Sequence, residues 1–290
     1  MMPRVMLKRL VKRSLQSVLR ALYPGPSRGV RVLEYHYVDD TGSSLSVSPA
    51  ELREHLQLIK REGFQTLSAD AFAERVLTGK IGTKELFITF DDGFENFHTH
   101  AAPLLAEFGM AATVFVVTDL AGQPPLWLTQ DRPAIERFMA KFNLSSEEKR
   151  LYDRSMEYFA TCRLMTWEQV AEVKRLGMDV QSHTARHPFL TQIPQERLIE
   201  ELAGSRRTLK EKLGVESNLI CYPYGDCDDR VVAAARDAGY RIGFLSGRLN
   251  PQQDPLRIGR VPISGSMGLG EVGFRLHRAY EAFVRLTRRY

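Results

Sequence analysis

Short apolar runs alternate with amphipathic patterns of helical spacing along most of the chain. Residues 86–90 form a nearly continuous apolar run, which is typical of a parallel strand buried on both faces. Further strands are predicted at residues 30–37, 112–117, 178–182, 218–222, 240–245 and 257–263. The alternation predicts βα units around a parallel sheet, and at 290 residues an α/β barrel would form a single domain.

Capping signals predict where several helices begin. Ser48, Pro49 and Glu51 supply an N-cap, a proline in the first turn and a capping-box glutamate. Thr166 and Gln169 form a second capping box. Because helices follow strands in this order, the carboxyl ends of the strands should share one face, where α/β barrels keep their chemistry.

Residues 119–163 interrupt the alternation. They hold a Pro-Pro pair, Trp127 and charge-rich helical pieces, and they are too many for a simple connection. We expect an insertion over the mouth of the barrel, where Trp127 would contact the substrate. The predicted organisation is a basic amphipathic helix over 1–29, one domain over 30–265 that carries the insertion, and a basic helix over 266–290.

Basic charge is concentrated at the two ends of a chain that is otherwise 43% hydrophobic and 26% charged, with a formal net charge of +5. At the N-terminus apolar residues recur at helical spacing, at Leu7, Val11, Leu15, Val18 and Leu22. Such a helix either lies on an anionic membrane surface or packs its apolar stripe on the barrel. The basic residues concerned are Arg4, Lys8, Arg9, Lys12, Arg13 and Arg20, and at the C-terminus Arg275, Arg278, Arg285, Arg288 and Arg289.

The sequence lacks the features that would indicate a nucleic-acid partner, a membrane span or a disulfide framework. No recognition motif accompanies the basic charge, so nucleic acid is not expected. No apolar run approaches the length of a membrane span, and no secretory signal is evident, so we expect a protein that is cytoplasmic or peripheral at a membrane surface. Three cysteines are too few for a disulfide framework, although a Cys221–Cys227 pair is left open.

Two polar motifs follow predicted strands. Asp91 and Asp92 end the apolar run 86–90, and neighbouring side chains there point in different directions, so each carboxylate can take its own task. His183 and His187, four residues apart in a tight segment, can both reach one ion. One aspartate and two histidines suit a catalytic divalent metal, and the other aspartate is then available as a general base. The set indicates a metal-assisted hydrolase.

The motifs TFDDG at 89–93, HTARHP at 183–188 and YPYG at 222–225 together resemble those of polysaccharide deacetylases of the NodB-homology type, also called carbohydrate esterase family four. The resemblance covers about residues 32–262. Residues 35–38, Tyr-His-Tyr-Val, also resemble the subgroup that acts on poly-N-acetylglucosamine-like glycans. The family implies a distorted (β/α)7-type barrel and removal of N-acetyl groups from N-acetylglucosamine-type saccharides.

The resemblance also implies roles for individual residues. Asp91 matches the general base, and Asp92 with His183 and His187 matches the ligands of a divalent metal. Zinc is the expected ion, with Co²⁺, Ni²⁺ and Mn²⁺ as alternatives. The backbone N–H of Tyr224 would stabilise the oxyanion, and its side chain would line the substrate site.

The sequence departs from the family pattern at two positions. Many relatives have an arginine that pairs with the base where this chain has Cys221, so another cation must serve; Arg260 is preferred over Arg257. No clear general acid follows Tyr224, which leaves His36 in the opening strand or His277 near the C-terminus. These gaps keep two alternatives open: a glycan-binding module with impaired catalysis, or an amide hydrolase that acts on a non-sugar substrate.

Overall fold

A curled parallel sheet forms the centre of the molecule. The computed structural model describes residues 14–25, 29–43, 45–140, 146–247, 254–265 and 267–287. Its strands follow the order β10-β1-β5-β6-β7-β8-β9, with β4 beside β5 and every pair parallel. A parallel bridge from Phe244 to Ile258 connects β9 to the segment before β10. The predicted α/β barrel is therefore confirmed.

The strands are short and lie close to the predicted ranges. Those of the main sheet are β1 (Arg31–Tyr35), β4 (Gln65–Thr66), β5 (Glu85–Phe90), β6 (Thr113–Val116), β7 (Asp179–Ser182), β8 (Leu219–Cys221), β9 (Ile242–Phe244) and β10 (Val261–Pro262). A separate parallel pair consists of β2 (Tyr37–Val38) and β3 (Ser46–Val47). Two predicted strands differ in more than their ends: the one over 30–37 is broken at residue 36, and the one over 257–263 pairs in the main sheet only as β10.

Aromatic side chains fill the interior of the barrel. Phe87 of β5 stacks on Phe72 of α3 (Ala69–Thr78) at 4.2 Å between ring centroids, and Phe115 of β6 meets Phe244 of β9 at 5.4 Å. Side chains alternate along a strand, so the next inward positions after Phe87 are residues 89 and 91. The alternation that builds the core thus directs Asp91 to the mouth of the barrel.

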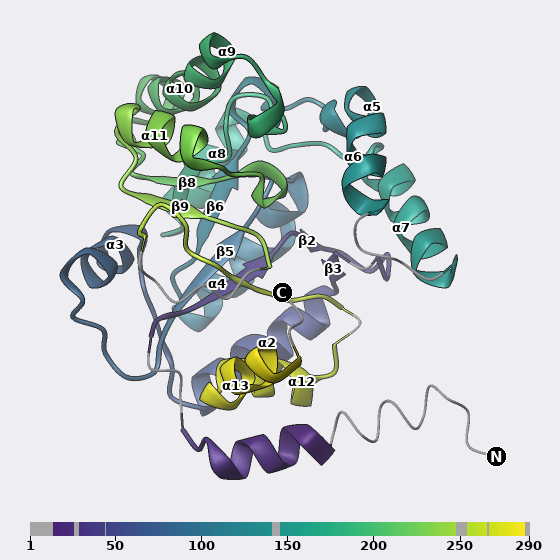
Figure 1. Cartoon of the computed structure of the whole chain (residues 1–290), viewed down its shortest axis with the longest axis vertical. Coiled ribbons are helices and arrows are strands. Elements are labelled where there is room, and N and C mark those ends of the chain that lie inside the picture. The colour runs from purple at the N-terminus through teal and green to yellow at the C-terminus, as the bar shows by residue number, and fades with distance from the viewer. Residues whose placement is uncertain are drawn as a thin grey trace.

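Helices cover the outside of the sheet (Figure 1). Both predicted capping boxes are present, at the start of α2 (Pro49–Arg61) and of α8 (Trp167–Arg175). Two further helices contain π-helical turns: η1 (Phe97–Ala101) leads into α4 (Ala102–Phe108), and η5 (Glu200–Gly204) lies between α9 (Gln195–Ile199) and α10 (Ser205–Leu213). Asp228 is the N-cap of α11 (Asp229–Asp237), and its side chain accepts from the Val231 N–H.

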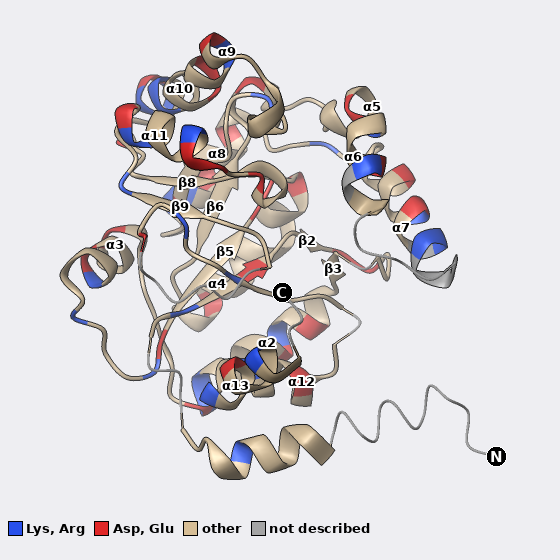
Figure 2. Cartoon of the chain, viewed as in Figure 1, with Lys and Arg blue, Asp and Glu red and all other residues tan. Residues whose placement is uncertain are grey.

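In its described residues, the region predicted as an insertion contains the α-helices α5 (Trp127–Gln130), α6 (Arg132–Met139) and α7 (Ser146–Phe159), which project to one side of the sheet (Figure 1). Trp127 and Phe159 pack with Tyr37 and Phe94 in an apolar cluster that joins these helices to the barrel. Basic and acidic residues are interspersed over α6 and α7 (Figure 2). The insertion is therefore anchored through aromatic side chains, and its charges lie on the outer surface.

The N-terminal helix packs on the barrel along a narrower face than predicted. Residues 14–22 are helical, and Leu15 and Leu19 contact the main core. Val18 and Leu22, predicted on the same face as Leu15, are 54% and 67% exposed, because the buried face runs through i and i+4 positions instead. Leu7 and Val11, and the basic residues Arg4, Lys8, Arg9, Lys12 and Arg13, lie outside the described residues.

The C-terminal segment forms two helices where one was predicted. α12 (Leu269–Leu276) and α13 (Arg278–Thr287) are separated at His277, whose φ and ψ of −90° and 155° are extended. Arg275 is buried and donates to the Pro262 carbonyl at 2.7 Å; Arg288 and Arg289 lie outside the described residues. Among the described helices, none has both the length and the apolarity to cross a membrane. Contact with an anionic membrane surface stays a prediction.

His55 on α2 is a buried titratable group, and it predicts how stability responds to acid. Burial lowers its pKa to about 4, and the charge of Glu51 acts in the opposite direction without cancelling this effect. Because the unfolded chain binds this proton near pH 6.5, stability is fully present above that pH and is lost as pH falls towards 4. We expect a loss of up to about 3 kcal/mol, measured by urea unfolding at pH 7 and pH 4.5.

The variant His55→Gln should lose this part of the pH dependence. The matched control is His100→Gln, which replaces an exposed histidine and should leave the pH dependence unchanged. Equal slopes of unfolding free energy against pH for wild type and His55→Gln would contradict the assignment.

Candidate functional site

Three side chains converge at the carboxyl ends of β5 and β7. The Nε2 atoms of His183 and His187 each lie 3.3 Å from Oδ1 of Asp92, and all three ligand atoms lie within 4.8 Å of one another. Ligands at 2.0–2.1 Å from a tetrahedral ion are separated by about 3.3–3.4 Å, so the spacing fits a cation held between them. Three predicted ligands, distant in sequence, are thus brought together in a geometry that suits a divalent metal.

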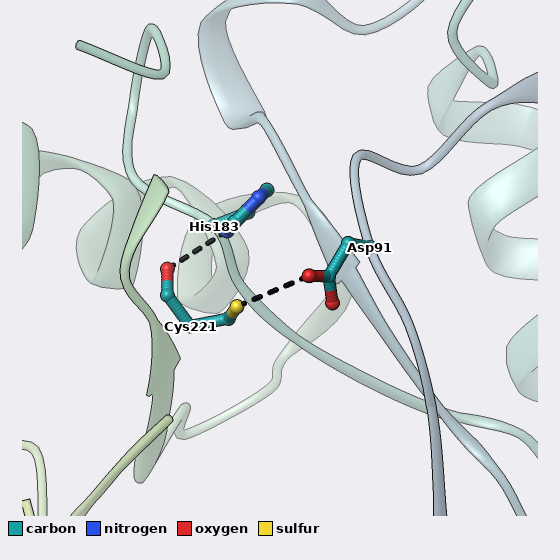
Figure 3. Close-up of side chains that lie close together, drawn as sticks. All are labelled: Asp91, His183 and Cys221. Atoms are coloured by element: carbon teal, nitrogen blue, oxygen red, sulfur yellow. Dashed lines mark hydrogen bonds between the residues drawn. The ribbon is translucent and has the colours of Figure 1, made fainter. Parts of the chain in front are cut away.

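The two imidazoles are oriented differently. Nδ1 of His183 donates to the Cys221 carbonyl at 2.8 Å (Figure 3). This leaves the Nε2 lone pair free to face Asp92 Oδ1 at 3.3 Å. Nδ1 of His187 has no hydrogen-bond partner among the described residues. Its ring is instead stacked on Trp127, with centroids 4.4 Å apart, and meets the Tyr224 ring edge-on at 4.7 Å. Both Nε2 atoms are therefore presented to one point.

The backbone around the site is strained. Five non-glycine residues in the described part of the chain have positive φ, and four of them belong to the three motifs: Asp92, Thr184, His187 and Tyr224. Each costs on the order of 1–3 kcal/mol, and such residues cluster at functional sites. Gly93 also has positive φ, and a Cβ there would lie 3.0 Å from Val116, so glycine is required after the two aspartates.

Asp91 is held as a carboxylate by a buried arginine. Arg260 donates from Nη1 to Oδ1 at 2.7 Å and from Nη2 to Oδ2 at 2.6 Å. Burial raises the pKa of Asp91, but the charge and hydrogen bonds of Arg260 outweigh it and lower the pKa to about 2. Arg260 thus occupies the role left open by Cys221, whereas Arg257 pairs with Asp229 outside the site.

Cys221 contacts both Asp91 and His183 (Figure 3). Its thiol donates to Asp91 Oδ2 at 3.4 Å and accepts from Arg260 Nη2 at 3.1 Å. Burial raises the pKa of this thiol well above its ordinary value, so it is protonated and neutral. Both Cys221 and Cys227 are free thiols in the structure.

Glu34 is a site residue that the sequence reasoning missed. Its carboxylate is buried, lies 3.3 Å from Arg260 Nη2, and accepts hydrogen bonds from Ser246 Oγ at 2.6 Å and Gly247 N at 3.1 Å. Arg260 is therefore shared by two carboxylates. The available signal was a charged residue at an inward position of the strand, two residues after the buried Val32.

Of the two histidines considered as a general acid, His36 is the one that lies near Asp91. Its Nε2 lies 3.8 Å from Asp91 Oδ2 and 3.9 Å from Glu34 Oε1, and its side chain is 20% exposed. A proton donor at this position can face a substrate from the open side. His277 instead contacts the Gly25 carbonyl at 3.2 Å, beside the N-terminal helix, so it is not part of the site.

Tyr224 and Trp127 form one wall beside His187. Tyr224 lies in the turn η6 (Pro223–Gly225), and its ring stacks on Phe189 at 3.9 Å. Trp127 was predicted to contact the substrate, but it is only 3% exposed. It offers little surface to a saccharide, so its position favours support of His187 over substrate contact. The oxyanion role of the Tyr224 N–H stays a prediction.

Comparison with known proteins identifies the family to which the chain is similar. The family model described as polysaccharide deacetylase matches residues 78–243. The chain is 26% identical over 240 residues to YxkH of Bacillus subtilis (strain 168), which is named as a polysaccharide deacetylase, covering 81% of this chain and 72% of that one. It is 27% identical to the poly-beta-1,6-N-acetyl-D-glucosamine N-deacetylase of Escherichia coli (strain K12), covering 87% of this chain but 39% of that protein.

The fold is similar to that of the Streptococcus pyogenes deacetylase PplD, solved in complex with acetate. The TM-score is 0.68, the sequence identity is 23%, and the match covers 87% of this chain and 99% of that one. At this identity the likeness concerns the fold.

Proposed function

Because this chain belongs to the polysaccharide deacetylase family, we propose that it is a metal-dependent hydrolase that removes N-acetyl groups from N-acetylglucosamine-type sugars or glycans. The observation that carries the proposal is the 3.3 Å spacing of both histidine Nε2 atoms from Asp92 Oδ1. The substrate class is supported by the E. coli relative, whose name specifies poly-beta-1,6-N-acetyl-D-glucosamine. The proposed catalytic unit spans 30–265, with 1–29 and 266–290 as basic helical additions.

Asp92, His183 and His187 would hold the ion. Zinc suits two imidazoles and a carboxylate, and Co²⁺, Ni²⁺ or Mn²⁺ can occupy similar sites. When bound, such an ion polarises the acetyl carbonyl and lowers the pKa of water towards about 7.

The remaining residues move protons and position charge. Asp91, kept ionised by Arg260, takes a proton from the attacking water, and His36 gives a proton to the leaving nitrogen. The amide C–N bond breaks, and the products are acetate and a free amine on the sugar. The backbone N–H of Tyr224 would stabilise the negative charge that develops on the acetyl oxygen.

The bidentate Arg260 contact favours a hydrolase over an impaired glycan-binding module. That alternative was motivated by the lack of a cation for Asp91 and of a general acid. Arg260 and His36 both lie within reach of the base, so the groups required for turnover have candidates in the site.

Metal removal tests the proposal. We expect chelator-treated protein to release acetate from a β-1,6-linked N-acetylglucosamine oligomer only at background rate, and Zn²⁺ or Co²⁺ to restore it, because the ligand set is empty without the ion. An N-acetylated non-sugar amide serves as the comparison substrate. Saccharide binding without acetate release under any of the four divalent ions would support the module, and preference for the non-sugar amide would reassign the substrate.

A further inference from the structure

The loop that carries both histidines is attached to a single buried glutamate. Between His183 and His187, the Ala185 N–H donates to the backbone carbonyl of Glu201 at 3.2 Å. The next N–H, of Arg186, donates to Glu201 Oε2 at 2.7 Å. Glu201 is 0% exposed. One residue therefore accepts two consecutive amides of the loop, one with its main chain and one with its carboxylate.

The opposite edge of this loop is held by the start of the insertion. The carbonyls of Thr184 and Ala185 accept from the N–H groups of Thr118 at 3.2 Å and Asp119 at 3.0 Å. The Arg186 side chain contacts Asp119 at 2.8 Å and Glu201 Oε1 at 3.5 Å. The loop is thus fixed between residues 118–119 and the π-helical turn η5.

The loop needs such attachment because its backbone is strained. Thr184 and His187 have φ of 68° and 63°, a region that non-glycine residues occupy only when surrounding contacts impose it. If the Arg186 N–H lost the buried Glu201 carboxylate as its acceptor, the loop would lose this attachment, and rotation of the loop would relieve the backbone strain. Such a rotation would carry His187 Nε2 away from Asp92.

The position of Glu201 depends on the π-turn. η5 interrupts the helix between α9 and α10, and π-turns of this kind often occur at functional sites. The flanking Leu198 and Leu202 are buried in the core beside β8, so the turn is fixed by packing. Glu201 is consequently held against the loop and has little freedom to leave it.

We propose that Glu201 is a positioning residue for the metal site: by accepting the Ala185 and Arg186 amides, it holds His183 and His187 in the strained loop geometry that lets both reach one cation. This inference rests on the proposed function, because it assumes that these histidines bind metal.

The test compares Glu201→Ala with Glu200→Ala, which truncates the exposed neighbour. Zn²⁺ affinity is measured by chelator competition on the full chain, with thermal unfolding in parallel. We expect Glu201→Ala to bind Zn²⁺ about 10–100-fold more weakly, as for other residues that orient metal ligands, and Glu200→Ala to match wild type. Glu201→Gln retains an oxygen acceptor and should restore affinity to within a few-fold.

A purely structural role for Glu201 would lower the unfolding temperature without changing the Zn²⁺ affinity of the folded protein, and that result would overturn the inference. If Glu201→Ala does not fold, Glu201→Asp takes its place, since it withdraws the carboxylate by one methylene; wild-type affinity there would equally overturn it. If the wild type binds Zn²⁺ and Glu201→Ala or Glu201→Asp binds it equally well, only this inference is rejected. Failure of wild type to bind any divalent ion rejects the proposed function itself.

Discussion

Replacement of Asp91 by asparagine is expected to lower acetate release by about 10²–10⁴-fold while leaving metal affinity within a few-fold of wild type. Asparagine keeps the size of the side chain and an oxygen that can accept from Arg260, but it cannot take a proton from water. The measurement is kcat at saturating Zn²⁺ on a β-1,6-linked N-acetylglucosamine oligomer, together with chelator competition for Zn²⁺.

The matched control is the neighbouring carboxylate. Asp92→Asn should lose Zn²⁺ affinity as well as turnover, because Asp92 Oδ1 is the point on which both histidine Nε2 atoms converge. The two adjacent aspartates should therefore separate into one variant that binds metal without turnover and one that binds metal poorly. Full activity of Asp91→Asn would show that the base has been misassigned.

The parts of the site that could be predicted are those encoded by local pattern. The apolar run 86–90 predicts a buried strand, and the aspartates at its end then lie at the mouth of an α/β barrel. The spacing of His183 and His187 likewise depends on one short loop. Strand alternation also places residue 34 inward, on the same face as Val32. A charged residue at such a position is unusual, so Glu34 could have been predicted as a site residue.

The parts that could not be predicted depend on contacts between distant segments. Arg260 reaches Asp91 only because β10 pairs with β1, so the sequence could favour Arg260 over Arg257 but could not establish the contact. Glu201 lies in an amphipathic segment rich in charge, where a solvated glutamate is the ordinary expectation. Its burial follows from the π-turn and from the loop that it contacts, and neither leaves a local signal.

Trp127 is a further example. Its sequence context indicated an insertion near the site, and an aromatic residue there suggested a sugar platform. Its stacking on His187 requires the packing of α5 against the apolar cluster with Phe94 and Phe159, which no pattern in the segment specifies.

Loss of the Arg260 charge is expected to destabilise the protein by about 3–5 kcal/mol, the usual cost of leaving buried charges without their partner. In Arg260→Met, Asp91 and Glu34 would face each other as buried carboxylates, and burial would then raise the pKa of Asp91 and disfavour its ionised form. Turnover should fall with it. Urea unfolding at pH 7 measures the first effect, and acetate release measures the second.

Glu34→Gln separates shared charge from packing. In the wild type this change removes one partner of Arg260 and should lower stability. In the Arg260→Met background it removes one of two unpaired carboxylates and should raise stability, so the sign of the same substitution reverses. Arg260→Lys should not substitute for the native residue, because a single ammonium cannot reproduce the paired 2.6 and 2.7 Å contacts to Asp91 while also facing Glu34 at 3.3 Å. A destabilisation by Glu34→Gln that is equal in both backgrounds would mean that Glu34 acts through Ser246 and Gly247 alone, and that Arg260 serves Asp91 only.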